Sequence, residues 1–370
     1  QIGSFFATMG IASLFMPAVM GIIADRWIPA QRLLGLCHLF AAGFITLAAT
    51  RTDYNSLYTL VLLSVMFYMP TIALSNSVAY NALEKAGLDT VTHFPPIRVW
   101  GTVGFICAMW VVDLGKMGLS ATQLYFSATL GLILGLYSFT LPNCPINRSG
   151  GGKSIVDLLG LRAFALFKQR KMAIFFIFSM LLGMSLQITN AFADGYIKSF
   201  GDTGIHGAKY LGTFGVEHST ILISLSQISE TLCILLIPFF LKRFGIKRVM
   251  LIAMFAWVLR FALLGAGNPG PGVWMFILSM IVYGVAFDFF NISGSLFVEK
   301  ETSAAIRSSA QGVFMIMTNG LGALIGSYLA GWVVNHYGWP LSWYLFAGFS
   351  LVVAIVFAVI FKYKHDPNRI

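Results

Sequence analysis

Long apolar stretches alternate with short polar loops along almost the whole chain. The apolar stretches cover residues 2–24, 31–50, 56–80, 96–112, 121–141, 171–195, 219–241, 249–267, 274–298, 305–334 and 341–362. As α-helices, stretches of this length span the roughly 30 Å hydrocarbon core of a bilayer. The pattern therefore predicts an all-α polytopic membrane protein with eleven transmembrane helices. A composition of 58% hydrophobic and 10% charged residues agrees, because a soluble protein of 370 residues needs far more polar surface.

The basic residues are distributed unevenly between alternate loops. One side carries Arg26, Arg32, Lys85, Arg148, Lys153, Arg162, Lys168, Arg170, Lys171, Lys242, Arg243, Lys247, Arg248, Lys300, Arg307, Lys362, Lys364 and Arg369. The other side carries only Arg51, Lys116, Lys198 and Lys209. The positive-inside rule then places the first set, including the C-terminus, in the cytoplasm and Gln1 outside. Because the formal net charge of +10 is divided among loops and forms no single basic face, we expect no nucleic-acid partner.

One loop motif occurs twice, at equivalent places in the chain. The first copy ends the first apolar stretch with Gly21, Asp25 and Arg26, and the second follows the seventh with Arg243, Gly245 and Lys247. Both copies resemble the loop signature of the major facilitator superfamily, although Ile28 and Pro29 stand where that family usually has Gly and Arg. The resemblance implies two half-bundles related by a parallel repeat, with the motif as a conformational loop.

The repeat also predicts the domain organisation. Gly21 and Pro238 hold the same place in the two copies and lie 217 residues apart. Applied to Lys171, where the second half begins, this offset puts the start of an opening helix about 46 residues before Gln1. We therefore expect a major-facilitator-type two-bundle fold in which the first of the usual twelve helices is missing. Its parts are a half-bundle at 1–141, a basic cytoplasmic linker at 142–170 and a six-helix half-bundle at 171–370.

Two acidic residues lie near the middle of apolar stretches. Asp288 is close to the centre of 274–298, and Glu230 is central in 219–241. An ionised carboxylate at that depth costs on the order of 2.5 to 3.5 kcal/mol, so each should face a cavity or a partner, or carry a proton. Tyr283 and Phe287 repeat at helical spacing beside Asp288 and add aromatic faces to that side of the helix.

Further polar residues share helix faces at similar depth. Gln187 and Asn190 are three residues apart in one stretch, and Gln227 lies one turn before Glu230 in the next. After Pro95 and Pro96, which we expect to open their helix, comes a stripe of Arg98, Thr102 and Phe105. Amides both donate and accept hydrogen bonds, Glu230 can accept from two hydroxyls, and aromatic rings stack on flat solutes. The set is typical of a pocket for a neutral, planar, hydroxyl-bearing solute.

Each of these residues also has a purely structural interpretation. The aromatic side chains can serve packing alone, the amides can bond between helices, and Arg98 can extend to the membrane surface. Arg260, central in 249–267, is expected to be a structural counter-ion to a buried acid, with Asp288 one candidate. Gly322 and Gly326, in a GxxxG spacing, are expected to pack against a neighbouring helix.

Several sequence blocks together resemble one family of transporters. At FPPIRVWGT, LQITN, SQISE, LRFAL, FDFFNISGSLFVEKE and FKYKH the chain closely resembles bacterial nucleoside permeases of the nucleoside:proton symporter family, within the major facilitator superfamily. The resemblance implies proton-driven uptake of uridine, adenosine or similar nucleosides across the bacterial inner membrane. It implies Asp288 as the coupling acid, with Glu230 a second candidate. It implies a substrate pocket of Arg98, Thr102, Phe105, Gln187, Asn190, Gln227, Glu230, Tyr283 and Phe287.

Other functions stay open at this stage. A facilitative transporter, a sugar:proton symporter or a non-transporting membrane sensor would have the same architecture. An enzyme is not expected, because no nucleophile elbow or phosphate-binding loop occurs at a plausible place. The four cysteines and six histidines show no metal-ligand spacing, so we expect no metal and no cofactor. The expected partners are a nucleoside, protons and membrane lipid, and we expect a monomer.

Overall fold

The computed structural model describes residues 2–88, 90–118, 120–145, 161–206, 209–302 and 307–363. These residues form helices and loops, and no strand occurs among them. The long helices are α1 (Ile2–Arg26), α2 (Ala30–Ala49), α3 (Tyr54–Lys85), α4 (Thr90–Leu114), α5 (Thr122–Ser138), α7 (Arg170–Ser199), α10 (Ser219–Ala266), α11 (Val273–Glu301) and α14 (Trp339–Ile360). One further span is built from α12 (Arg307–Met315), the π-helix η2 (Ile316–Gly322) and α13 (Ala323–Tyr337). Short helices are η1 (Leu161–Lys168), α8 (Thr203–His206) and α9 (Phe214–Glu217).

The structure confirms the predicted all-α polytopic architecture. Nine helices in the described part are long and apolar enough to cross a membrane. One of these, the 48-residue α10, contains two of the predicted stretches, and α5 adds a further span of 17 residues. Inside α10 the chain reverses at Gly245, whose φ of 76° and ψ of 165° lie outside the helical region and suit glycine. The described residues therefore contain eleven spans, as the apolar pattern predicts.

Two predicted helix boundaries differ from the structure. Helix α4 begins at Thr90, so Pro95 and Pro96 lie inside its second turn and do not open the helix. Helix α3 continues to Lys85, beyond the end of the apolar stretch at residue 80. Both differences have the same physical reason. Polar residues near a membrane surface continue a helix as readily as apolar ones, and an apolar pattern does not detect them.

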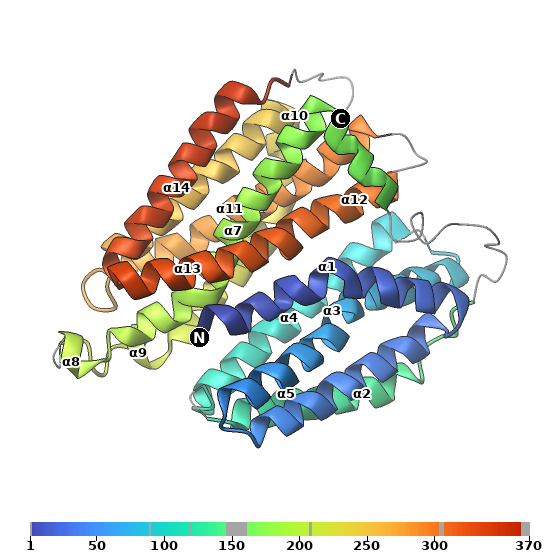
Figure 1. Cartoon of the computed structure of the whole chain (residues 1–370), viewed down its shortest axis with the longest axis horizontal. Coiled ribbons are helices and arrows are strands. Elements are labelled where there is room, and N and C mark those ends of the chain that lie inside the picture. Colours follow the sequence, from blue (N-terminus) through green and yellow to red (C-terminus); the bar gives the residue numbers. More distant parts are fainter. Residues whose placement is uncertain are drawn as a thin grey trace.

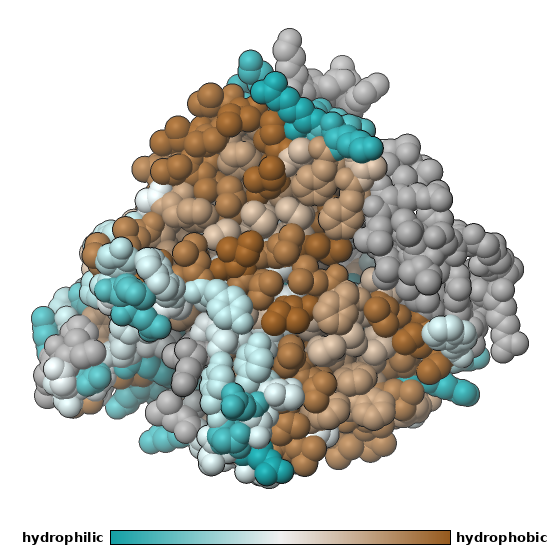
Figure 2. All heavy atoms as spheres, in the orientation of Figure 1, coloured by the Kyte–Doolittle hydropathy of each residue, from teal (hydrophilic) through white to brown (hydrophobic). Residues whose placement is uncertain are grey.

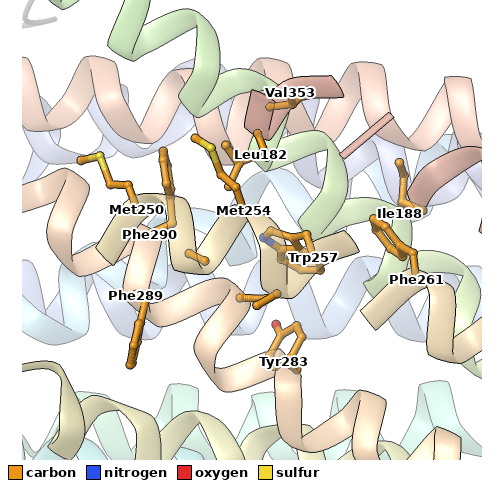
Figure 3. Packing of buried hydrophobic residues seen from close by; sticks show 14 of the residues in the cluster. Leu182, Ile188, Met250, Met254, Trp257, Phe261, Tyr283, Phe289, Phe290 and Val353 are labelled. Carbon is orange, nitrogen blue, oxygen red and sulfur yellow. The ribbon is translucent and has the colours of Figure 1, made fainter. Parts of the chain in front are cut away.

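The helices form two groups that lie side by side (Figure 1). Helices α1 to α5 make up the first group, in which α2 packs against both α3 and α5. Helices from α7 to α14 make up the second group, in which α10 packs extensively against α11 and α14. The larger apolar core lies in the second group, where Trp257, Phe261 and Phe289 are fully buried (Figure 3). One face of the molecule is broadly hydrophobic across both groups, with hydrophilic residues gathered at its margins (Figure 2).

Glycines allow the closest contacts between helices. A Cβ added to Gly322 would lie 2.6 Å from the carbonyl oxygen of Met180 in α7, and one on Gly326 would lie 2.8 Å from Cα of Met184. These distances agree with the expected packing role of the GxxxG pair. Between the two groups, a Cβ on Gly10 of α1 would meet the backbone of η2 and α13 at 2.7 to 2.8 Å. The two groups therefore touch backbone to backbone along α1.

Gly183 gives a test of this packing. A Cβ at Gly183 would overlap the backbone carbonyl of Thr318, which cannot rotate away as a side chain can. We predict that Gly183→Ala lowers the thermal midpoint of the detergent-purified protein, by an amount equivalent to about 1 to 3 kcal/mol of overpacking. The control is Gly348→Ala, because an added Cβ there has no atom within 4 Å. Equal midpoints for the two variants would contradict the prediction.

Candidate functional site

The two predicted mid-depth acids lie near one another in the second group of helices. Asp288 of α11 is only 3% exposed, and its Oδ2 has no hydrogen-bond partner among the described residues. Glu230 of α10 is half-buried and close enough to Asp288 for the two carboxylates to repel when both are ionised. A buried carboxylate without a donor is costly to ionise. The surroundings of Asp288 in this conformation therefore do not satisfy an ionised carboxylate.

Aromatic side chains of α11 form a wall beside the two acids. The rings of Tyr283 and Phe287 stack with centroids 5.9 Å apart and an interplanar angle of 21°. Trp257 of α10 meets the Tyr283 ring edge-on at 6.0 Å (Figure 3). Tyr283 is buried, whereas Phe287 is half-buried and lines a hollow. The aromatic wall is therefore closely packed at Tyr283 and borders the hollow at Phe287.

The predicted amides occupy the neighbouring helices. Gln187 of α7 is 6% exposed, and its Nε2 lacks a hydrogen-bond partner among the described residues. Asn190, one turn further along α7, is exposed and lies near the side chain of Tyr283. Gln227 of α10 is half-buried. A buried amide donor without an acceptor costs free energy, so Gln187 has capacity for a polar ligand.

The predicted stripe on α4 faces the second group. Arg98 is exposed and attracts Glu230 electrostatically, although the two residues belong to different groups of helices. Thr102 is half-buried, and Phe105 is 53% exposed. The structure brings the stripe of α4 to the same side as the acids of α10 and α11.

Further along the same helices, α4 and α10 make direct contact. The indole Nε1 of Trp110 donates to Ser224 Oγ at 2.8 Å, and the Asp113 carboxylate lies 2.6 Å from Nδ1 of His218. The side chain of Asp113 is only 4% exposed, so this contact is shielded from solvent. We call this the closed end of the site. The sequence analysis missed these four residues; Asp113 continues the stripe of Arg98 and Thr102, a helical spacing that could have identified it.

Arg260 does not have the expected partner. Its Nε donates to Thr189 Oγ1 at 2.9 Å, and its Nη1 donates to the carbonyl of Ser279 at 2.6 Å. The guanidinium also lies over the Tyr283 ring, 4.7 Å from its centroid. No carboxylate within the described part of the chain forms an ion pair with it. The buried guanidinium is satisfied by a backbone carbonyl, a hydroxyl and the face of an aromatic ring. Its contact with that ring also holds Tyr283 in place.

The loop-motif residues lie at the ends of helices. Gly245 makes the turn within α10, Arg243 is exposed beside it, and Lys247 donates to the carbonyl of Ala358 at 3.1 Å. Gly21 lies in α1, where an added Cβ would meet no atom within 4 Å. The side chains of Asp25 and Arg26 lie outside the described part. The second copy thus ties the turn of α10 to α14.

Comparison with known proteins identifies the class. The family model described as "Nucleoside H+ symporter" matches residues 1–366. Nucleoside permease NupG of Escherichia coli (strain K12) is 51% identical over 99% of this chain and 88% of its own length. Xanthosine permease of the same organism is 50% identical over 100% of this chain and 89% of its own. A crystal structure of a mutant of the nucleoside transporter NupG has a TM-score of 0.93 at 50% identity, covering 98% of this chain and 90% of that one.

The fold and the facing polar helices define a multi-pass membrane transporter of the major-facilitator type. A structure of the peptide transporter POT, at 15% identity and a TM-score of 0.71, shares this fold. Within that class, the chain belongs to the nucleoside H+ symporter family. Its relatives at about 50% identity are transporters, so the protein is not an enzyme.

The closed end makes a prediction about coupling between the two groups of helices. We expect Asp113→Asn and His218→Gln each to lower the thermal midpoint, and the double variant to lose less than the sum of the two. Partners in direct contact typically show coupling of about 0.5 to 3 kcal/mol. Lys198→Gln is the control, because its pair with Asp194 is more exposed and lies within α7, so a smaller effect is expected. Strictly additive shifts would show that the Asp113–His218 contact couples nothing.

Proposed function

We propose that this protein takes up nucleosides together with protons across the bacterial inner membrane. The observation that carries the proposal is the buried Asp288 carboxylate, which lacks a partner beside Glu230 and the aromatic wall in a member of the nucleoside H+ symporter family. A protonatable carboxylate beside the solute contacts couples the binding of a proton to the binding of the solute. The family relationship favours this function over a sugar:proton symporter or a sensor.

The chemistry of the site suits a nucleoside. The ring of Phe287 offers a stacking face, and Gln187 and Asn190 can pair with the edge of a base. Glu230 can accept hydrogen bonds from two ribose hydroxyls, with Arg98 close by on α4. Gln227, Thr102 and Phe105 complete the proposed contacts. Uridine and adenosine are the first substrates to test, and xanthosine follows from the name of one relative.

Proton coupling is assigned to Asp288. In the present conformation the apolar surroundings and the nearby Glu230 disfavour its ionised form. Rearrangement of the helices would bring water or Arg98 closer and allow the proton to leave. A membrane potential contributes about 2.3 kcal/mol per charge per 100 mV, which corresponds to roughly fiftyfold accumulation for one proton. This magnitude is sufficient for useful uptake.

Alternating access follows from the two groups of helices. We infer that residues 1–141 and 171–370 are half-bundles that rock about the site, with 142–170 as the cytoplasmic linker. The basic loops place the ends of α1 and α3 in the cytoplasm, so the closed end at Asp113 and His218 faces outward. The exposed side chains of Arg98 and Phe105 then belong to a pathway open towards the cytoplasm. The structure would accordingly represent an inward-open state.

Uptake into proteoliposomes tests the proposed function. With the purified protein and an imposed proton gradient, labelled uridine should accumulate above its external concentration, and a protonophore should abolish the accumulation. Unlabelled nucleosides should compete, and sugars should not. If uridine only equilibrates across the membrane while the proton gradient is present, the protein is a facilitator. Competition by sugars would overturn the substrate assignment.

Asp288→Asn separates coupling from binding. Asparagine keeps the size and polarity of the side chain but cannot release a proton, so accumulation should fall to the level seen without a gradient while exchange of bound nucleoside continues. Asp53→Asn is the matched control. Asp53 is an exposed N-cap whose carboxylate accepts from the Ser56 N–H at 2.8 Å, and asparagine caps helices equally well. Undiminished proton-driven accumulation by Asp288→Asn would remove this residue from the coupling role.

A further inference from the structure

A small hollow, with room for a group about the size of a water molecule, adjoins the proposed site. It lies between α7, α10, α11 and η2. Its walls include the aromatic side chains of Trp257, Phe287 and Phe290, and its polar lining comes from Asn291, Thr318 and Asn319. Phe287 belongs both to this hollow and to the aromatic wall beside Asp288. The hollow therefore extends the proposed site by one helical turn along α11, from Phe287 to Asn291.

The π-helix η2 turns Asn319 towards the hollow. Gly320 of η2 faces α1, since an added Cβ would lie 2.8 Å from Leu14 Cδ2, and Gly322 faces Met180 of α7. These two glycines fix η2 between its neighbours, and Thr318 and Asn319 are left to line the hollow. Short π-helical turns within α-helices occur frequently at functional sites. Here the turn places an amide at the wall of an aromatic chamber.

The two amides of the hollow have unused hydrogen-bonding capacity. The side chain of Asn291 has no hydrogen-bond partner among the described residues, and Asn319 Nδ2 donates only to the sulfur of Met315 at 3.7 Å. Sulfur is a weak acceptor that a ligand oxygen or nitrogen would readily replace. Thr318, by contrast, already donates to the carbonyl of Phe314 at 2.9 Å. The hollow thus offers two free amides, aromatic faces and no charged side chain in its lining.

This combination matches a nucleobase better than a ribose. A ribose is hydroxyl-rich and non-planar and suits a carboxylate such as Glu230. A base is flat, with donors and acceptors only at its edge, and amides can pair with either kind of edge group. The hollow is too small for a ring, but it has room for the exocyclic substituent at the edge of a base that lies against Phe287.

We propose that Asn291 and Asn319 bind the exocyclic substituent of the nucleobase and determine which bases the protein accepts, while Gln187 and Asn190 pair with other groups of the base edge. The inference rests on the proposed function. The base would lie against Phe287 with its exocyclic substituent between the two amides, and the ribose would lie towards Glu230. Thr318 and Phe290 then form part of the wall of the hollow and do not hydrogen-bond to the substituent.

Binding ratios test this assignment independently of proton coupling. Dissociation constants of the purified protein in detergent are measured for inosine, for purine riboside, which lacks the substituent at C6, and for 2′-deoxyinosine. Asn291→Leu and Asn319→Leu should reduce the preference for inosine over purine riboside by roughly three- to tenfold, the effect of one lost hydrogen bond. The preference for inosine over 2′-deoxyinosine should stay unchanged. Serine variants at both positions repeat the test where a leucine variant does not fold.

The control is Asn335→Leu, an exposed asparagine near the end of α13, which should change neither ratio. An unchanged ratio of inosine to purine riboside in all four variants would overturn the inference while leaving the proposed function intact. A changed ratio of inosine to 2′-deoxyinosine would assign the hollow to the ribose and would also overturn it. A parent protein that binds neither these three nucleosides nor uridine would reject the proposed function itself.

Discussion

A carboxylate that is removed from water and given no hydrogen-bond donor is the constraint on which this structure depends. Asp288 is such a group, on a helix whose neighbours are almost entirely apolar. The cost of ionising it in this conformation can be met only by a proton or by a rearrangement that supplies water or a cation. A protein that alternates between two such environments can exchange protons between the two sides of a membrane.

The two arginines near the site make different kinds of contact. Arg260 is held by Thr189, the Ser279 carbonyl and the Tyr283 ring, all within the second group of helices. Arg98 acts across the two groups, and its attraction to Glu230 depends on how far apart the groups stand. Movement of the groups therefore changes the electrostatic surroundings of Glu230 and leaves those of Arg260 intact. This division favours rocking of whole groups over deformation within one.

Close backbone contacts at glycine define where the two groups of helices move against each other. Gly10 brings α1 against η2 and α13 without intervening side chains, and Asp113 and His218 join α4 to α10 at one end only. Elsewhere on α4, Phe105 remains exposed. A pathway that is shut at one end and open at the level of the site suits alternating access. The π-helix places Asn319 at the hollow, where it adds to the proposed solute contacts of the second group.

The sequence by itself determined the eleven spans, the paired loop motif and the depth of Asp288 and Glu230, because each depends on local apolar length or on position within one helix. Resemblance added the substrate pocket as a set of residues. Only the tertiary structure decided that Arg260 bonds to a hydroxyl and a carbonyl, that Asp113 meets His218, and that a π-helix directs Asn319 into a hollow. These features depend on the rotation of one helix against another. Helix rotation is set by packing between residues far apart in the chain, and a one-dimensional pattern does not record it.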